Sequence, residues 1–194
     1  VGALRANRFG SFTLSFTPRD AGGIGIAQQL VFTVAGVNDA PEVAARVATF
    51  AEDVSVDVVL AHITPGPFNE AGTLTLSNIS FTDPNDVIDD VPTLPTVVIV
   101  NNDTVHITPK LKANKNGSFS VTFTVNDGGA APNATTATVA VTVTPVNDPP
   151  TLTAPLVFAA MLGKAHSSKF TVNDVDGDNV TLSVTRTPTG TTLS

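Results

Sequence analysis

Acidic residues in this sequence gather where runs of alternating apolar residues stop, and carboxylates brought together can hold a divalent cation. Two Asn-Asp pairs, Asn38-Asp39 and Asn147-Asp148, stand in the phrases VNDAP and VNDPP. The acids at the ends of the runs are Asp39, Glu52, Asp53, Asp83, Asp86, Asp127, Asp148, Asp174 and Asp176. Ca²⁺ takes about six to eight hard oxygen ligands in irregular geometry, so such a gathering favours it. The first hypothesis is therefore Ca²⁺ bound near the Asn-Asp pairs.

An Asn-Asp pair before proline is also an ordinary turn, because Asx side chains cap the backbone and proline fixes φ. The segments DPND (83–86) and DVDGD (174–178) are turn sequences of the same kind. DVDGD lacks the twelfth-position glutamate and the flanking helices of an EF-hand, which excludes that motif. Ion ligands and purely structural turns both remain open interpretations.

The two phrases belong to a longer internal repeat. GSFTLSFTPRDAGG (10–23) matches GSFSVTFTVNDGGA (117–130), with Gly, Ser, Phe, Phe and Asp each recurring 107 residues later. LVFTVAGVNDAP (30–41) then matches VAVTVTPVNDPP (139–150) at an offset of 109 residues. Two blocks in the same order predict a repeat of domain size. We expect residues 1–40 to be the C-terminal part of one repeat, 41–149 a complete repeat, and 150–194 the N-terminal part of a third.

The apolar residues of the complete repeat alternate with period two, which is typical of strands with one buried face. Strands are predicted near 43–50 and at 54–60, 73–81, 96–100, 104–108, 118–125 and 138–144, with an Asn-Asn-Asp turn at 101–103. No segment has a helical period. About seven short strands in one repeat predict an all-β fold, a Greek-key β-sandwich, repeated in a linear array.

Composition excludes several classes of protein. The net charge is -7, the chain has no cysteine, and tryptophan and tyrosine are also absent. Nucleic-acid binding requires clustered basic residues, and thiolate metal sites require cysteine. The sequence contains no run of eighteen apolar residues, so it predicts no membrane-spanning helix. The histidines His62, His106 and His166 have no metal-ligand spacing and no recognisable serine–histidine–acid arrangement, and Glu70 is a single acid in a loop. We expect no enzymatic activity.

The linker phrases, FTVNDGG (123–129) and FTVNDVDGDNVTLSV (170–184) resemble the cadherin-like and Ig-like tandem repeats of large extracellular proteins, found in bacterial adhesins and in surface proteins of algae and other protists. The segment ITPGPFNEAGTLTL (63–76) is similar to a phrase that recurs in that group. The resemblance covers all three repeats, although each motif is short, the longest being that at 170–184. It implies an extracellular or cell-surface location.

The resemblance also implies Ca²⁺ ligands at the two junctions. The first would use Asn38, Asp39, Asp83, Asn85 and Asp127, and the second would use Glu52, Asn147, Asp148, Asp174 and Asp176. The sequence departs from the cadherin pattern, because no Asp-Arg-Glu motif occurs and FAAML (158–162) stands where the complete repeat has FAEDV (50–54). These departures predict fewer ions than the three of a full cadherin junction.

Sequons provide a further set of candidate sites. Asn102, Asn116 and Asn133 fall in predicted turns, where a glycan is accepted if the source is eukaryotic. The sequence as a whole predicts a structural or adhesive module, forming a rod or filament with neighbouring repeats and with other subunits of a surface filament. Two alternatives are a module that binds carbohydrate or protein, and a non-catalytic spacer of a large secreted enzyme.

Overall fold

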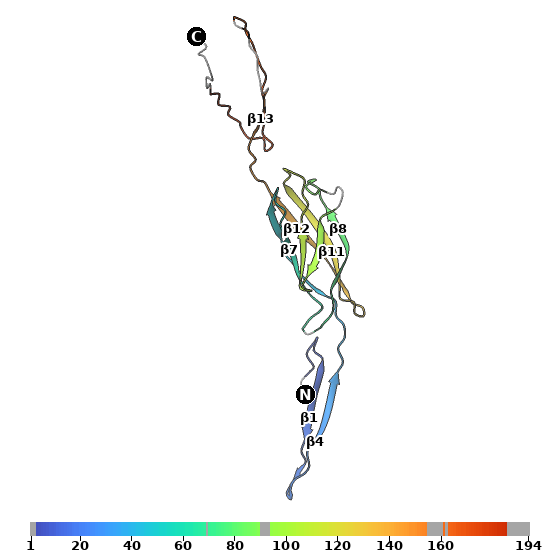
Figure 1. Ribbon diagram of the computed structural model, residues 1–194. Coiled ribbons are helices and arrows are strands. Elements are labelled where there is room, and N and C mark those ends of the chain that lie inside the picture. The colour runs from blue at the N-terminus through green and yellow to red at the C-terminus, as the bar shows by residue number, and fades with distance from the viewer. Residues whose placement is uncertain (1–2, 69, 90–93, 155–160, 162, 186–194) are drawn as a thin grey trace. The chain divides into compact units, whose positions relative to one another are not determined.

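A computed structural model describes residues 3–68, 70–89, 94–154, 161 and 163–185 (Figure 1). Every regular element among these residues is a β-strand, so the predicted all-β class is confirmed. The chain divides into two compact units, Val1–Thr144 and Pro145–Ser194. Within the described ranges, no helix has the length and apolar character needed to cross a membrane. The boundaries at residues 40/41 and 149/150 and the tandem arrangement remain predictions.

Residues 42–144 of the first unit form a sandwich of two four-stranded sheets (Figure 1). One sheet has the order β5-β7-β10-β9, with strands Glu42–Ala45, Val58–Thr64, Thr104–Thr108 and Thr96–Val100. The other has the order β6-β12-β11-β8, with strands Ala48–Ala51, Ala134–Thr144, Gly117–Asn126 and Thr75–Thr82. All pairs are antiparallel except β6 and β12, which are parallel.

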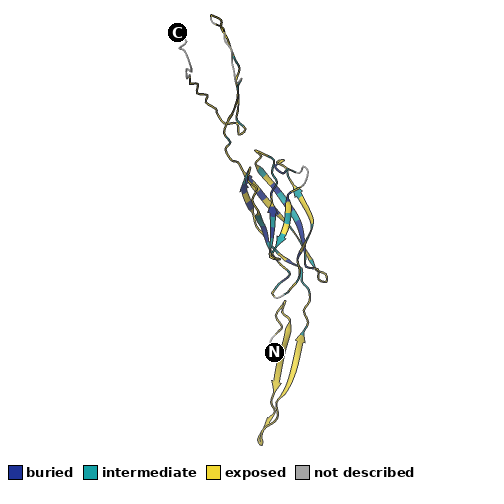
Figure 2. Cartoon of the chain, in the orientation of Figure 1, coloured by how far each residue is buried: buried dark blue, intermediate teal, exposed yellow. Residues whose placement is uncertain are grey.

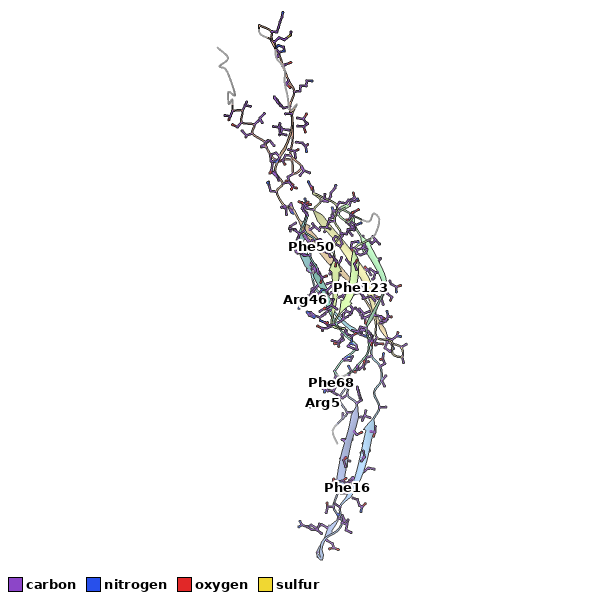
Figure 3. All side chains as sticks on the ribbon, in the orientation of Figure 1. Arg5, Phe16, Arg46, Phe50, Phe68 and Phe123 are labelled. Atoms are coloured by element: carbon purple, nitrogen blue, oxygen red, sulfur yellow. The ribbon has the colours of Figure 1, made fainter. Side chains whose placement is uncertain are left out.

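The core lies between the two sheets because each strand points alternate residues inward. Phe119, Val121 and Phe123 on β11 are at most 3% exposed. The intervening serine and threonine residues face outward, and Thr122 and Thr138 are hydrogen-bonded across β11 and β12 at 2.8 Å. Figure 2 shows the buried residues gathered inside the sandwich, and Figure 3 labels Phe50 and Phe123 among its strands. The predicted alternation of this repeat therefore matches its buried face.

The first predicted strand of the repeat is corrected to two strands in different sheets. The interruption lies at Arg46 and Val47, whose side chains are exposed. β5 pairs with β7 on one side of this break, and β6 pairs with β12 on the other. The predicted strand at 54–60 is also shifted, since Asp53 has a φ of 61° and turns the chain before β7 begins at Val58.

Two smaller arrangements flank the sandwich in sequence. β1 (Gly10–Phe16) and β4 (Gln28–Val34) form an antiparallel hairpin, whose distal part contains the two-residue strands β2 (Arg19–Asp20) and β3 (Gly23–Ile24). The second unit contains the antiparallel pair β13 (Thr151–Thr153) and β14 (Thr171–Asn173). Both arrangements have mainly exposed side chains.

The seated linker as a candidate functional site

The linker between β4 and β5 is anchored by the side-chain amide of Asn38. Its Nδ2 lies 2.9 Å from Ala130 O, 2.9 Å from Pro132 O, 3.2 Å from Asp127 Oδ2 and 3.2 Å from Asp39 O. An amide group has two N–H donors, so four acceptors share two protons. The two shorter contacts, to Ala130 and Pro132, are the stronger hydrogen bonds. Asn38 is therefore inserted into the loop that connects β11 to β12.

That loop is shaped by the Asp127-Gly128-Gly129 turn. Asp127 Oδ1 accepts a hydrogen bond from Gly129 N at 2.7 Å, and the Asp127 side chain is mostly buried. Gly128 has a φ of +75°, which glycine adopts without steric cost. A Cβ on Gly129 would overlap the side chain of Asn38. The two glycines therefore serve different purposes, since the first makes the turn and the second leaves room for the linker.

Two further side chains hold the linker on the sandwich. Both carboxylate oxygens of Glu70 lie 3.2 Å from the backbone N of Asp39, and Thr135 donates a hydrogen bond to Pro41 O at 2.6 Å. Pro41 itself is buried. The linker from Asn38 to Pro41 is thus fixed by three separate parts of the sandwich: the β7–β8 connection, the β11–β12 loop and strand β12.

A polar hollow of about 240 Å³ lies beside this linker. Its lining includes Arg8, Asp39 and Glu70. The guanidinium carbon of Arg8 also lies 2.9 Å from the ring centre of Phe68, a cation–π geometry. Charges of both signs therefore line the hollow.

The structure brings together part of the ligand set predicted for the first junction and corrects the rest. Asn38, Asp39 and Asp127 meet at the linker, but Asp83 and Asn85 do not join them. Asn85 Oδ1 accepts a hydrogen bond from Ser118 N at 3.1 Å, at the start of β11, whereas Asp127 follows its end. Ten residues of strand separate the two places by about 30 Å. The antiparallel pairing of β8 with β11 causes this separation, because β8 ends where β11 begins.

The residues predicted for the second junction are divided between the two units. Glu52 is buried in the sandwich, and its backbone N donates to Thr144 O at 3.0 Å. Within the second unit, Asp148 N donates to Asp176 Oδ2 at 2.6 Å, and Asp176 N donates to Asp174 Oδ1 at 3.1 Å. Asn147 Nδ2 lies 3.4 Å from Asp148 O. The three aspartates Asp148, Asp174 and Asp176 are therefore linked through one small turn.

No group of three or more histidine, aspartate or glutamate side chains arranged to hold a metal ion is found in the part of the chain that the structure describes. At the second linker, the hydrogen bonds above connect three aspartates, Asp148, Asp174 and Asp176. At the first linker, the Asn38 amide nitrogen already lies where the oxygens converge. A cation at this place would require the Asn38 side chain to turn its amide nitrogen away from these oxygens, and Ca²⁺ at the first linker stays a prediction.

The sequon asparagines differ in their surroundings. Asn116 is exposed, whereas Asn102 accepts a hydrogen bond from Leu74 N at 2.6 Å and donates one to Gly72 O at 2.8 Å. Asn133 is half-buried and donates to Gly129 O at 3.1 Å. A glycan attaches to the side-chain amide, and in this fold the amides of Asn102 and Asn133 are engaged in these hydrogen bonds.

One polar cluster was not recognised from the sequence. Thr104 Oγ1 lies 2.9 Å from His106 Nε2, and His106 Nδ1 lies 2.5 Å from Asp57 Oδ2. Thr104 and His106 share a face of β10 because they are two residues apart, a signal visible in the sequence. Asp57 gives no such signal, since it comes from the turn before β7. The cluster fastens that turn to β10.

Comparisons with known proteins yield a small set of similar folds. No protein-family model matches the chain, and no curated protein matches it. The human desmocollin-1 ectodomain is 22% identical over 74% of this chain and 28% of its own, with a TM-score of 0.46. An endo-fucoidan hydrolase of glycoside hydrolase family 107 is 16% identical over 74% and 20%, with a TM-score of 0.37. The titin domains Z1Z2 in complex with telethonin are 14% identical over 60% and 53%, with a TM-score of 0.32.

Proposed function

We propose that this chain is a structural or adhesive extracellular module, without catalytic activity, whose sandwich repeats are joined in series by linkers seated on the following repeat. The observation that carries this proposal is the insertion of Asn38 into the β11–β12 loop, with Glu70 and Thr135 holding Asp39 and Pro41. A linker fixed at several points transmits orientation from one repeat to the next. Stiffness of that kind suits a rod or filament, in which neighbouring repeats and other subunits are the partners.

The residues that hold the linker also explain why two separate phrases recur. The Asn of VNDAP requires the Asp-Gly-Gly turn of the following sandwich, which supplies the acceptor oxygens and the space above Gly129. A mutual requirement between linker and turn is expected of a joint that is repeated along a chain. It is not expected of a flexible tether, which needs only length and polarity.

Replacing Asn38 with alanine tests this joint. The variant Asn38→Ala loses the amide contacts and leaves backbone oxygens unpaired, at a cost of about 1–3 kcal/mol. We expect the linker amides, above all that of Asp39, to exchange with deuterium roughly tenfold faster or more. The matched control is Asn147→Ala, in the same phrase of the second linker, and we expect little change at residues 38–41. If the linker amides exchange with deuterium at the same rate in Asn38→Ala, the proposal that the linker is fixed on the sandwich is wrong.

We further propose that Ca²⁺ binds at the second linker, where Asn147, Asp148, Asp174 and Asp176 supply oxygen ligands. These hydrogen bonds gather three aspartates around one turn, and a hard divalent cation would offset the mutual repulsion of their carboxylates. Thermal melts and calorimetric titration with CaCl₂ check this part. We expect binding heat and a higher melting temperature, both lost in Asp174→Asn/Asp176→Asn and both retained in the control Glu42→Gln. Absence of heat and of a shift would remove Ca²⁺ and leave the seated linker standing.

A further inference from the structure

Strand β8 is interrupted by a bulge at the free edge of its sheet. The sheet order places β8 at one end, with β11 as its hydrogen-bonded neighbour. Opposite Phe123 of β11 the register shifts, and two residues of β8, Asn78 and Ile79, occupy the place of one. Such an insertion is a β-bulge, a feature common at sheet edges that redirects side chains. Asn78 is therefore not an ordinary member of an alternating strand, although the sequence predicts one at 73–81.

The backbone at the bulge leaves Asn78 in solvent. Its φ of 51° lies in the left-handed region, which asparagine adopts more readily than most other residues with a side chain. Asn78, Ile79 and Ser80 are all exposed. Among the described residues, none forms a hydrogen bond or ion pair with the Asn78 side chain. The side-chain amide of Asn78 is therefore accessible in the folded sandwich.

Asn78-Ile79-Ser80 is also a sequon for N-linked glycosylation. In that reaction Nδ2 of the asparagine forms a bond to the anomeric carbon of a lipid-linked oligosaccharide, the lipid diphosphate leaves, and the amide loses one proton. The folded repeat must then leave room for a bulky polar group. Asn78 meets this condition, whereas the amides of Asn102 and Asn133 are engaged in loop hydrogen bonds.

We propose that Asn78 is an N-glycosylation site of this sandwich. An edge strand offers unpaired backbone N–H and C=O groups to other chains, and proteins commonly block such edges. A glycan in the middle of β8 occupies the space beside this edge. The site lies within the sandwich and at neither linker. The proposal shares the extracellular location with the proposed function, but it rests on neither the seated linker nor Ca²⁺.

Secretion of the 194-residue chain from a eukaryotic cell line, behind a cleavable signal peptide, tests the site. The purified chain is treated with peptide N-glycosidase in water enriched in heavy oxygen, which turns each glycosylated asparagine into a labelled aspartate. Peptide mass spectrometry then locates the label. We expect it at Asn78 in most secreted molecules. A sample kept in the same water without the enzyme measures spontaneous deamidation.

Two matched variants test whether the label depends on the sequon. Ser80→Ala removes the required hydroxyl and is expected to lose the label at Asn78, whereas Ser80→Thr keeps a hydroxyl and is expected to retain it. Circular dichroism and the melting temperature verify that both variants fold. An unlabelled Asn78 in the wild-type chain overturns the proposal, and so does a label that persists in Ser80→Ala. Neither result bears on the linker, which Asn38→Ala tests separately.

Discussion

The hairpins β1–β4 and β11–β12 have closely similar sequences and opposite surroundings. GSFTLSF in β1 and GSFSVTF in β11 put phenylalanine at the same alternate positions, yet the first strand is exposed along its whole length (Figure 2). β11 lies between β12 and β8, and β12 lies between β11 and β6, whereas β1 and β4 pair only with each other among the described residues. Alternation therefore determines which face of a strand is apolar, and neighbouring elements determine whether that face is buried.

The largest expected difference between the two hairpins comes from removing a phenylalanine ring. Phe123 is fully buried and Phe16 is 54% exposed at the matching position; Figure 3 labels both. Phe123→Ala is expected to lower the free energy of unfolding of the sandwich by about 3–5 kcal/mol, from lost burial and a residual cavity. Phe16→Ala is expected to cost less than about 1 kcal/mol. Urea denaturation followed by circular dichroism measures both, and equal losses would contradict the difference in burial.

A smaller difference is expected at the glycines that follow the aspartate turns. Gly129 and Gly22 stand at equivalent positions, but a Cβ on Gly129 would overlap Asn38, whereas one on Gly22 would lie 3.3 Å from Asp20 Oδ1. Gly129→Ala is expected to cost about 1–3 kcal/mol by displacing the linker. Gly22→Ala is expected to be nearly neutral. Melting temperatures together with deuterium exchange at residues 38–40 measure the effect, and a neutral Gly129→Ala would show that the linker is not seated there.

The smallest effect concerns the acid stability of the sandwich, in which a lysine lies beside an aspartate. Lys112 donates a hydrogen bond to Asp86 and its charge lies close by, so the pKa of Asp86 is lowered from its ordinary value of 3.8. A lowered pKa in the folded state stabilises the fold above about pH 3.8, and this contribution is lost as the pH falls through the lowered value. Asp86→Asn should therefore reduce stability slightly at neutral pH and not in strong acid. Unfolding curves from pH 7 to pH 2 check this, with Asp20→Asn as the hairpin control.

Many strands of the sandwich could be predicted from the local pattern of apolar and polar residues. The strands Thr96–Val100 and Thr104–Thr108 were predicted to the residue, because period-two alternation is interrupted by an Asn-Asn-Asp turn in which Asn101 and Asn102 have positive φ. The break of the first strand at Arg46 and Val47 could not be predicted from the sequence. Which sheet a strand joins depends on partners far along the chain, and the pattern of one strand carries no information about them.

Part of the linker site could also be predicted from the sequence. Asn38 and Asp127 were found because their phrases recur, and repetition is visible in a sequence. Glu70, Gly129 and Thr135 contact the linker across 31 to 94 residues, and nothing in their own neighbourhoods marks them for it. Asp83 and Asn85 were grouped with them from the resemblance to cadherin-like repeats, whereas the antiparallel pairing of β8 with β11 places them at the other end of the sandwich.

The parallel pairing of β6 with β12 has a mechanical consequence. The chain enters the second sheet at Ala48 and leaves it at Thr144, and the two strands are in register from Ala48↔Val141 to Ala51↔Thr144. The entering end of β6 and the leaving end of β12 therefore lie at opposite ends of the pair. Tension along the chain pulls these strands past each other, in shear, across hydrogen bonds that are loaded together. The bond from Glu52 N to Thr144 O lengthens that ladder, so the sandwich resists extension where its two termini are tied to each other.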